Sequence, residues 1–164
     1  MNEKMLIKNL YDLDKTIAKP LLEKLDYPWE ALPKIKDFII ELGKTLDPEI
    51  YEQRGENIWV AKSATVYPSA HLGGPLIICE DAEVRHCAFI RGCAIVGKGA
   101  VVGNSTELKN SILFDGVQVP HYNYIGDSIL GYKSHTGAGT ITSNLKSDKS
   151  LVTVNCDNEK IETG

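Results

Sequence analysis

The stretch VAKSATVYPSAHLGGPLIICEDAEVRHCAFIRGCAIVGKGAVVGNSTEL, residues 60–108, repeats with a period of six. An aliphatic residue stands at every sixth position: Val60, Val66, Leu72, Ile78, Val84, Ile90, Val96, Val102 and Leu108. Four places after each of them the side chain is usually small, as at Ala64, Ala82 and Thr106. Neither the 3.6-residue period of an α-helix nor the two-residue period of a flat strand produces this double register.

A triangular coil explains both registers. Each six-residue unit forms one flat side and one corner, with the aliphatic side chain inward and the small residue where the backbone turns tightly. Each buried aliphatic side chain contributes about 1.5–3 kcal/mol, but no single unit can bury its own inner face. Successive coils must therefore stack as parallel strands about 4.8 Å apart. The sequence predicts a mainly β protein, a left-handed parallel β-helix of the hexapeptide-repeat type, over residues 56–145.

The six-residue register slips by one place near residue 110 and again after Ile125. The inward positions then become Leu113, Val119, Ile125, Leu130 and Thr136. A slip of this kind usually marks a corner that has gained or lost a residue. The two slips flank His121, which draws attention to that part of the β-helix.

The two ends of the chain lack the six-residue period. Residues 1–55 are predicted to be helical, and four apolar residues there follow the i, i+3, i+4, i+7 spacing of one helix face: Ile35, Phe38, Ile39 and Leu42. We expect a small helical cap packed on the β-helix rather than a separate functional module. Residues 146–164 predict an extended loop or hairpin. A β-helix that stopped there would expose strand edges, which leaves open a truncated chain.

Composition narrows the class of protein. The 18 basic and 22 acidic residues give a net charge of -4, which argues against a nucleic-acid partner. No apolar run approaches the roughly 20 residues needed to cross a bilayer, so we expect no membrane partner and a cytoplasmic location. The four cysteines show no CxxC spacing, so a zinc ribbon is not expected. Because a cytoplasmic setting disfavours disulfides, we expect these cysteines to be reduced thiols.

Two cations are expected to lie in one column of the β-helix. Arg91 and Lys109 are 18 residues apart, so each coil should place one above the other. Like charges at roughly 5 Å repel each other unless an anion lies between or beside them. Gly73 occupies the column below, so no acid there compensates, but an acid from a neighbouring subunit could. The pair predicts either a phosphate site or two solvated surface cations.

Two further stretches could carry chemistry. His121, in the sequence PHYNY, has surroundings suited to proton transfer, although the spacing alone favours a structural histidine. The sequence GAGT at residues 137–140 would let a ligand approach the backbone, or would simply form a tight corner.

A metal site is the weaker reading of the histidines. His86, Asn104 and His121 should share one column, which places the two histidines two coils, or roughly 10 Å, apart. Zinc ligands lie about 2 Å from the ion, so these two cannot share one within a chain. A resemblance to γ-class carbonic anhydrases would need a histidine where Gly126 stands. No metal is therefore predicted.

Four motifs carry a resemblance to a known family. They are RGCAIVGKGAVVGN at residues 91–104, ELKN at 107–110, HYNYIGD at 121–127 and GAGTITSN at 137–144. In this order and spacing the chain resembles the C-terminal acetyltransferase domain of bifunctional N-acetylglucosamine-1-phosphate uridyltransferase. The resemblance covers about a third of the chain through these motifs, and about half through the six-residue repeat.

The resemblance implies a homotrimer that transfers acetyl from acetyl-CoA to the amino group of glucosamine-1-phosphate, in nucleotide-sugar metabolism. It implies that His121 is the general base. It also implies that Arg91 and Lys109 hold the sugar phosphate, and that Tyr124 contacts the sugar. Ala138 and Asn144 would lie beside acetyl-CoA.

The chain departs from that family at several points. His135 replaces a sugar-contacting asparagine and is expected to contact the substrate in its place, while Leu145 replaces a tyrosine. The later coils that complete the CoA site in that family are absent from this sequence. Residues 1–55 also lack a glycine-rich nucleotide-binding start, so uridyltransferase activity is not expected. Two hypotheses follow: an acetyltransferase acting on an amino-sugar phosphate, and a non-catalytic β-helix that binds a sugar nucleotide or serves as a trimerisation scaffold.

Overall fold

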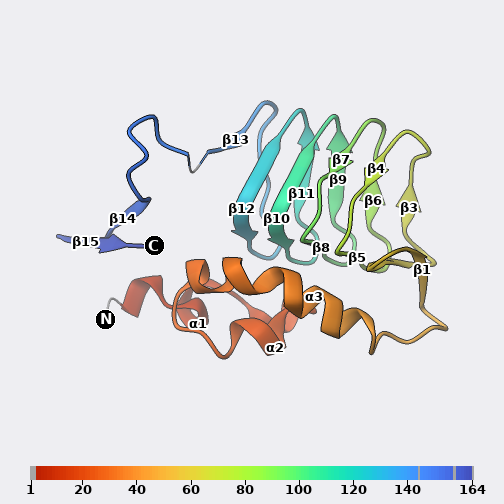
Figure 1. The fold of residues 1–164 in the computed structure, drawn as a ribbon, viewed down its shortest axis with the longest axis horizontal. Coiled ribbons are helices and arrows are strands. Elements are labelled where there is room, and N and C mark those ends of the chain that lie inside the picture. The colour runs from red at the N-terminus through yellow and green to blue at the C-terminus, as the bar shows by residue number, and fades with distance from the viewer. Residues whose placement is uncertain (1–2, 144, 157, 164) are drawn as a thin grey trace.

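The chain folds into a left-handed parallel β-helix with a layer of short helices along one side (Figure 1). The computed structural model describes residues 3–143, 145–156 and 158–163. The predicted fold class is therefore confirmed, including the helical cap.

The β-helix has three faces, each built from parallel strands that belong to successive coils. The first face contains β2 (Ile58–Ala61), β5 (Leu76–Ile78), β8 (Ala94–Val96) and the second halves of β10 (Glu107–Leu113) and β12 (Tyr124–Leu130). The second face contains β3 (Thr65–Val66), β6 (Glu83–Val84), β9 (Val101–Asn104) and β11 (Gln118–His121). The third face contains β4 (His71–Leu72), β7 (Phe89–Ile90), the first halves of β10 and β12, and β13 (Ile141–Thr142).

Strand pairing shows where the coils shorten. Leu72 pairs with Ile90 and Ile90 with Leu108, a step of 18 residues, whereas Leu108 pairs with Ile125, a step of 17. The missing residue is lost at the corner between the third and first faces, where β10 and β12 continue around the bend without a break. Asn110 and Asp127 turn this corner with φ of 50° and 44°, a left-handed conformation that asparagine and aspartate tolerate. Both predicted slips are therefore present.

The core lies inside the prism. The aliphatic residues of the middle coils that were predicted to point inward are fully buried, from Ile78 through Ile125. Val66 and Leu130 are only partly buried, whereas Val60 in the first coil is fully buried.

The helices cover the first face (Figure 1). They are η1 (Glu3–Met5), α1 (Ile7–Leu10), η2 (Leu13–Lys15), α2 (Lys19–Leu22), η3 (Pro28–Lys34) and α3 (Ile35–Gly43). An outward column of the first face, made of Trp59, Ile77, Ile95 and Ile112 in register, is buried beneath them. Ile35 and Ile39 supply the matching buried stripe of α3. The second and third faces keep their outward side chains available for other contacts.

Two small strand pairs complete the fold. β1 (Tyr51–Gly55) runs antiparallel to β2 and covers the exposed edge of the first coil. At the other end the chain leaves the β-helix after β13 and forms an antiparallel hairpin from β14 (Thr153–Cys156) and β15 (Glu159–Glu162). Across the described ranges, no helix has the length and apolar character needed to cross a bilayer.

Candidate functional site

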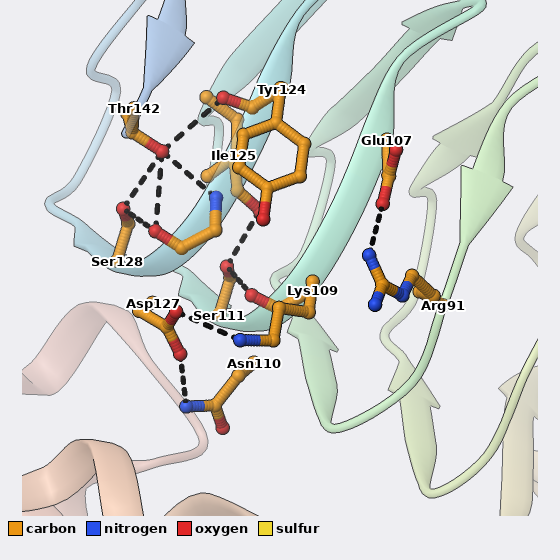
Figure 2. A network of polar contacts seen from close by, with 11 residues as sticks. Arg91, Glu107, Lys109, Asn110, Ser111, Tyr124, Ile125, Asp127, Ser128 and Thr142 are labelled. Carbon is orange, nitrogen blue, oxygen red and sulfur yellow. Dashed lines mark hydrogen bonds and ion pairs between the residues drawn. The ribbon is translucent and has the colours of Figure 1, made fainter. Parts of the chain in front are cut away.

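The outer side of the third face carries the cations predicted from the sequence. Ile90 pairs with Leu108, so the residues that follow them, Arg91 and Lys109, lie one coil apart in the same column. The neighbouring outward column contains Glu107 and Tyr124, which are paired with each other. This surface therefore alternates positive, negative and aromatic side chains within one small area (Figure 2).

Each cation is paired with an acid of the same chain. Arg91 Nη1 lies 3.0 Å from Glu107 Oε1, and Lys109 Nζ lies 3.0 Å from Asp127 Oδ2 (Figure 2). The sequence had suggested that an acid from a neighbouring subunit could relieve the repulsion, and the structure places an acid of the same chain beside each cation. Both acids stand at positions that the six-residue period leaves unassigned, since the period fixes columns and not side-chain rotamers.

Asp127 fixes the position of the Lys109 amine. Its carboxylate accepts hydrogen bonds from Lys109 Nζ at 3.0 Å and from Asn110 Nδ2 at 2.8 Å. The Asp127 side chain is only 14% exposed, against 40% for Lys109, so the ion pair is open to solvent on the lysine side. An anion approaching from outside would therefore meet the ammonium group before the carboxylate.

Tyr124 leans across the third face. A Cβ placed on Gly126 would lie 2.5 Å from the Tyr124 hydroxyl, so the ring occupies the space above this glycine. Gly126 is the partner of Lys109 in the next coil, which brings the phenol hydroxyl into the cation column. Gly126 is thus required to let the ring lie there.

A network of hydroxyl groups supports this face, and the sequence reasoning missed it. Thr142 Oγ1 accepts a hydrogen bond from the Gly126 N–H at 2.8 Å, and it donates one to the Tyr124 carbonyl oxygen at 3.2 Å (Figure 2). Ser111, which is buried, donates to Ile125 O at 3.0 Å. The signal in the sequence was a hydroxyl residue at a small-residue position, Ser111, and another at an inward position, Thr142.

His121 lies at the edge between the second and third faces. It is the last residue of β11, pairs with Asn104 and is exposed. The backbone beneath it is fixed by Asn123, whose Oδ1 accepts the His121 N–H at 3.1 Å and whose Nδ2 donates to Gly137 O at 2.7 Å. Because Asn123 is buried, this corner is held firmly while the imidazole stays accessible.

The GAGT sequence forms the next corner along the same edge. The Gly139 N–H donates to His121 O at 3.1 Å, and Gly139 has a φ of 74°, the left-handed region that glycine adopts without strain. This register places the exposed Ala138 one coil away from His121 in the same column. A ligand lying along this edge could contact both residues.

The structure does not bring every expected site residue together within one chain. His121 ends β11, before the corner at which the third face begins, whereas Lys109 pairs with Gly126 at the far end of that face, with Tyr124 between them. His135 belongs to the second face, where it bridges to Gln118, because the corner at Gly137 separates it from Tyr124. Asn144 lies outside the described residues.

The histidines predicted to share a column do lie along one edge of the β-helix. His121 pairs with Asn104 one coil away, and His86 lies one coil further along the same edge, because the Ser105 N–H donates to His86 O. Among the residues that the structure describes, no group of three or more His, Cys, Asp or Glu side chains is placed to hold a metal ion.

These features define a class of protein. A left-handed β-helix of six-residue repeats, with the motifs around Arg91, Lys109 and His121, is a hexapeptide-repeat domain of the acetyltransferase type. The chain belongs to the family described as the GMPPB C-terminal domain, which matches residues 72–162.

Curated relatives match only part of this chain. The bifunctional protein GlmU of Methanococcus aeolicus is 46% identical over 59 residues, which are 36% of this chain and 14% of that protein. The bifunctional protein GlmU of Zymomonas mobilis is 36% identical over 106 residues, 63% of this chain and 23% of that protein. The chain therefore covers less than a quarter of either relative.

A third relative and one solved structure also resemble part of this chain. The bifunctional sugar-1-phosphate nucleotidylyltransferase/acetyltransferase of Sulfurisphaera tokodaii is 38% identical over 60 residues, 37% of this chain and 15% of that protein. The acetyltransferase domain of PglB from Neisseria gonorrhoeae has a TM-score of 0.49 at 23% identity, covering 51% of this chain and 42% of that one.

Proposed function

We propose that the chain transfers acetyl from acetyl-CoA to the amine of an amino-sugar phosphate such as glucosamine-1-phosphate, in nucleotide-sugar metabolism. The observation that supports this most is the outer side of the third face, where Arg91 and Lys109 share a column and Tyr124 leans toward them. Two cations one coil apart suit a phosphate dianion, which can displace or share the acids that now pair with them.

The chemistry requires a group that accepts the amine proton. His121 is exposed at the edge of the same face on a corner fixed by Asn123, so its imidazole suits this role. As the neutral amine attacks the thioester carbonyl, His121 would take the proton and the CoA thiolate would leave. Ala138 is proposed to line the acetyl-CoA site along this edge. Asn144, which lies outside the described residues, is proposed as a second acetyl-CoA contact.

The proposed enzyme is a homotrimer, for a reason that lies in where the site residues stand on the faces of the β-helix. His121 stands before the corner at which the third face begins, Lys109 stands at the far end of that face, and His135 stands on the second face. A groove between two copies of the chain would bring the second face of one copy against the third face of another. In that arrangement His135 could reach a sugar held by Tyr124 and Lys109 of the neighbouring copy.

Turnover of acetyl-CoA with glucosamine-1-phosphate tests the proposal, with the N-acetylated product detected by mass spectrometry. We expect His121→Asn to lower kcat by about 10²–10⁴-fold, the usual contribution of a general base. Lys109→Gln should mainly raise KM. His71→Gln, on the same face but outside the site, is the matched control. Full activity of the His121→Asn variant would exclude the assigned base.

One observation favours a second function, a non-catalytic β-helix that binds a sugar nucleotide or serves as a scaffold. Glu107 and Asp127 already neutralise both cations within the chain, which weakens their attraction for a free phosphate. Thermal stabilisation by UDP-N-acetylglucosamine without any effect of CoA would support this function. Stabilisation by CoA together with turnover would exclude it.

A further inference from the structure

One cysteine of the chain belongs to a constellation of three side chains drawn from two coils. Cys87 Sγ lies 3.3 Å from His86 Nε2, and His86 Nδ1 lies 2.6 Å from Ser69 Oγ. The Ser69 oxygen also accepts the backbone N–H of Cys87 at 3.2 Å, which ties the serine of one coil to the cysteine of the next. A nucleophile, a base within reach and a third group that orients the base are the parts of an activated thiol.

The hydrogen-bond pattern allows the imidazole to act as a base toward sulfur. Ser69 Oγ can accept both the Cys87 N–H and a proton on His86 Nδ1, because a hydroxyl oxygen has two acceptor positions. In that tautomer His86 Nε2 carries a lone pair directed at Cys87 Sγ. The thiol proton then has an acceptor, and the resulting thiolate is left beside an imidazolium ion.

The other cysteines lack this environment. Cys79 is buried, and burial raises the pKa of its thiol to about 12. Burial also raises the pKa of Cys93. Cys156, in β14, is partly exposed and serves as an internal reference. Cys87 is the exposed one, and it lies at a corner where its φ is 55°.

We propose that Cys87 is a reactive thiol, activated by His86 and positioned by Ser69, that is reversibly modified by low-molecular-weight disulfides. The thiolate attacks one sulfur of the disulfide, and the S–S bond of the disulfide breaks. One half forms a mixed disulfide with Cys87, and the other half leaves as a thiolate that takes the proton held by His86. No further oxidant is consumed, and a free thiol reverses the step.

The modified cysteine would lie close to the proposed groove between two copies of the chain. His86 and His121 share one edge of the β-helix, two coils or roughly 10 Å apart. A bulky group on Cys87 would therefore lie at the mouth of that groove. The reactivity itself does not depend on the proposed acetyl transfer, so the two can fail separately.

The test is the rate at which oxidised glutathione modifies each cysteine of the full chain, followed by peptide mass spectrometry at pH 7 and pH 9.5. An ordinary thiol is only a few per cent ionised at pH 7, so we expect Cys87 to react about tenfold faster than Cys156. His86→Gln keeps an amide that can bond to Ser69 but cannot take the proton, and should remove this advantage at pH 7. At pH 9.5, where hydroxide removes the proton, this variant should match the unmodified sequence.

Two controls make the outcome decisive. Cys79 stays unmodified as long as the chain is folded, so its protection verifies each variant. Ser69→Ala should lower the Cys87 rate at pH 7 without abolishing it, because the imidazole loses its orientation but not its basicity. A His86→Gln variant that reacts as fast as the parent at pH 7 overturns the proposal, as does a Cys87 that reacts no faster than Cys156.

Discussion

Replacing Gly103 with alanine should force two coils of the β-helix apart. Gly103 is buried in β9, facing the backbone of Pro120 in the next coil. An added Cβ would come far closer than 3.0 Å to the carbonyl carbon and oxygen of Pro120, and backbone cannot rotate away as a side chain does. The coils must separate locally, which lengthens the Tyr122 N–Asn104 O bond of 2.9 Å and the Thr106 Oγ1–Val119 O bond of 3.1 Å.

The expected cost follows from these contacts. Two weakened hydrogen bonds cost about 1 kcal/mol each, and the overpacked backbone adds about 1–3 kcal/mol. The total of about 3–5 kcal/mol corresponds to a melting temperature lower by roughly 10 °C for a chain of this length. Gly137→Ala is the matched control, because no atom lies within 4 Å of its Cβ position and no left-handed φ is recorded there.

Circular dichroism melting at equal protein concentration measures both variants. Equal concentration matters because the melting temperature of an oligomer depends on it. A Gly103→Ala variant that melts within about 2 °C of the parent would refute the close approach of the two coils, since that shift corresponds to less than about 1 kcal/mol. Gly137→Ala should stay within about 0.5 kcal/mol of the parent.

Three further predictions concern the helical cap, the loss of folding stability at acid pH, and the column of cations formed by Arg91 and Lys109. Ile95→Ala should lower the free energy of unfolding in urea by about 2–5 kcal/mol, because this side chain is buried, whereas Ile141→Ala on the open third face should cost little. Burial alone would raise the pKa of Glu80, but hydrogen bonds from Lys98 and Tyr51 outweigh it and lower the pKa below the ordinary value of 4.5. The stability that this carboxylate contributes is therefore present above pH 4.5 and is lost as the pH falls below it. The urea midpoint of Glu80→Gln should decline less between pH 5 and pH 3 than that of the parent. An equal decline of the two midpoints would contradict this. Asp127→Asn removes the carboxylate 3.0 Å from Lys109 Nζ, and calorimetry with inorganic phosphate should show binding tightened several-fold, whereas unchanged affinity would mean that Lys109 does not meet the phosphate.

Much of the fold was predictable because one physical rule governs it. Inward aliphatic residues at every sixth position can be buried only by stacking coils, so both the prism and the two shortened corners follow from the spacing. The cover on the first face was less visible. Its signal is a second aliphatic residue directly before the inward one in one unit of every three, as in Ile77–Ile78, Ile95–Val96 and Ile112–Leu113.

The candidate site was predictable in part. Spacing placed Arg91 over Lys109, since columns are set by the backbone alone. It did not reveal Glu107 and Asp127 as their partners, because rotamers of long side chains depend on local packing. His135 was grouped with these residues through family resemblance, and the corner at Gly137 places it on another face. Spacing along one chain cannot show which faces of different copies meet.

The isoleucine column under the helices has a consequence for anyone shortening this chain. This column is an apolar surface that is shielded from water only because the N-terminal segment lies on it; it consists of Trp59, Ile77, Ile95 and Ile112. A fragment starting at β2 would keep every inward rung yet present that surface to water, together with the unpaired edge that β1 now covers. Such a fragment should precipitate or stack on itself, which makes the first fifty residues a solubility device as much as a structural one.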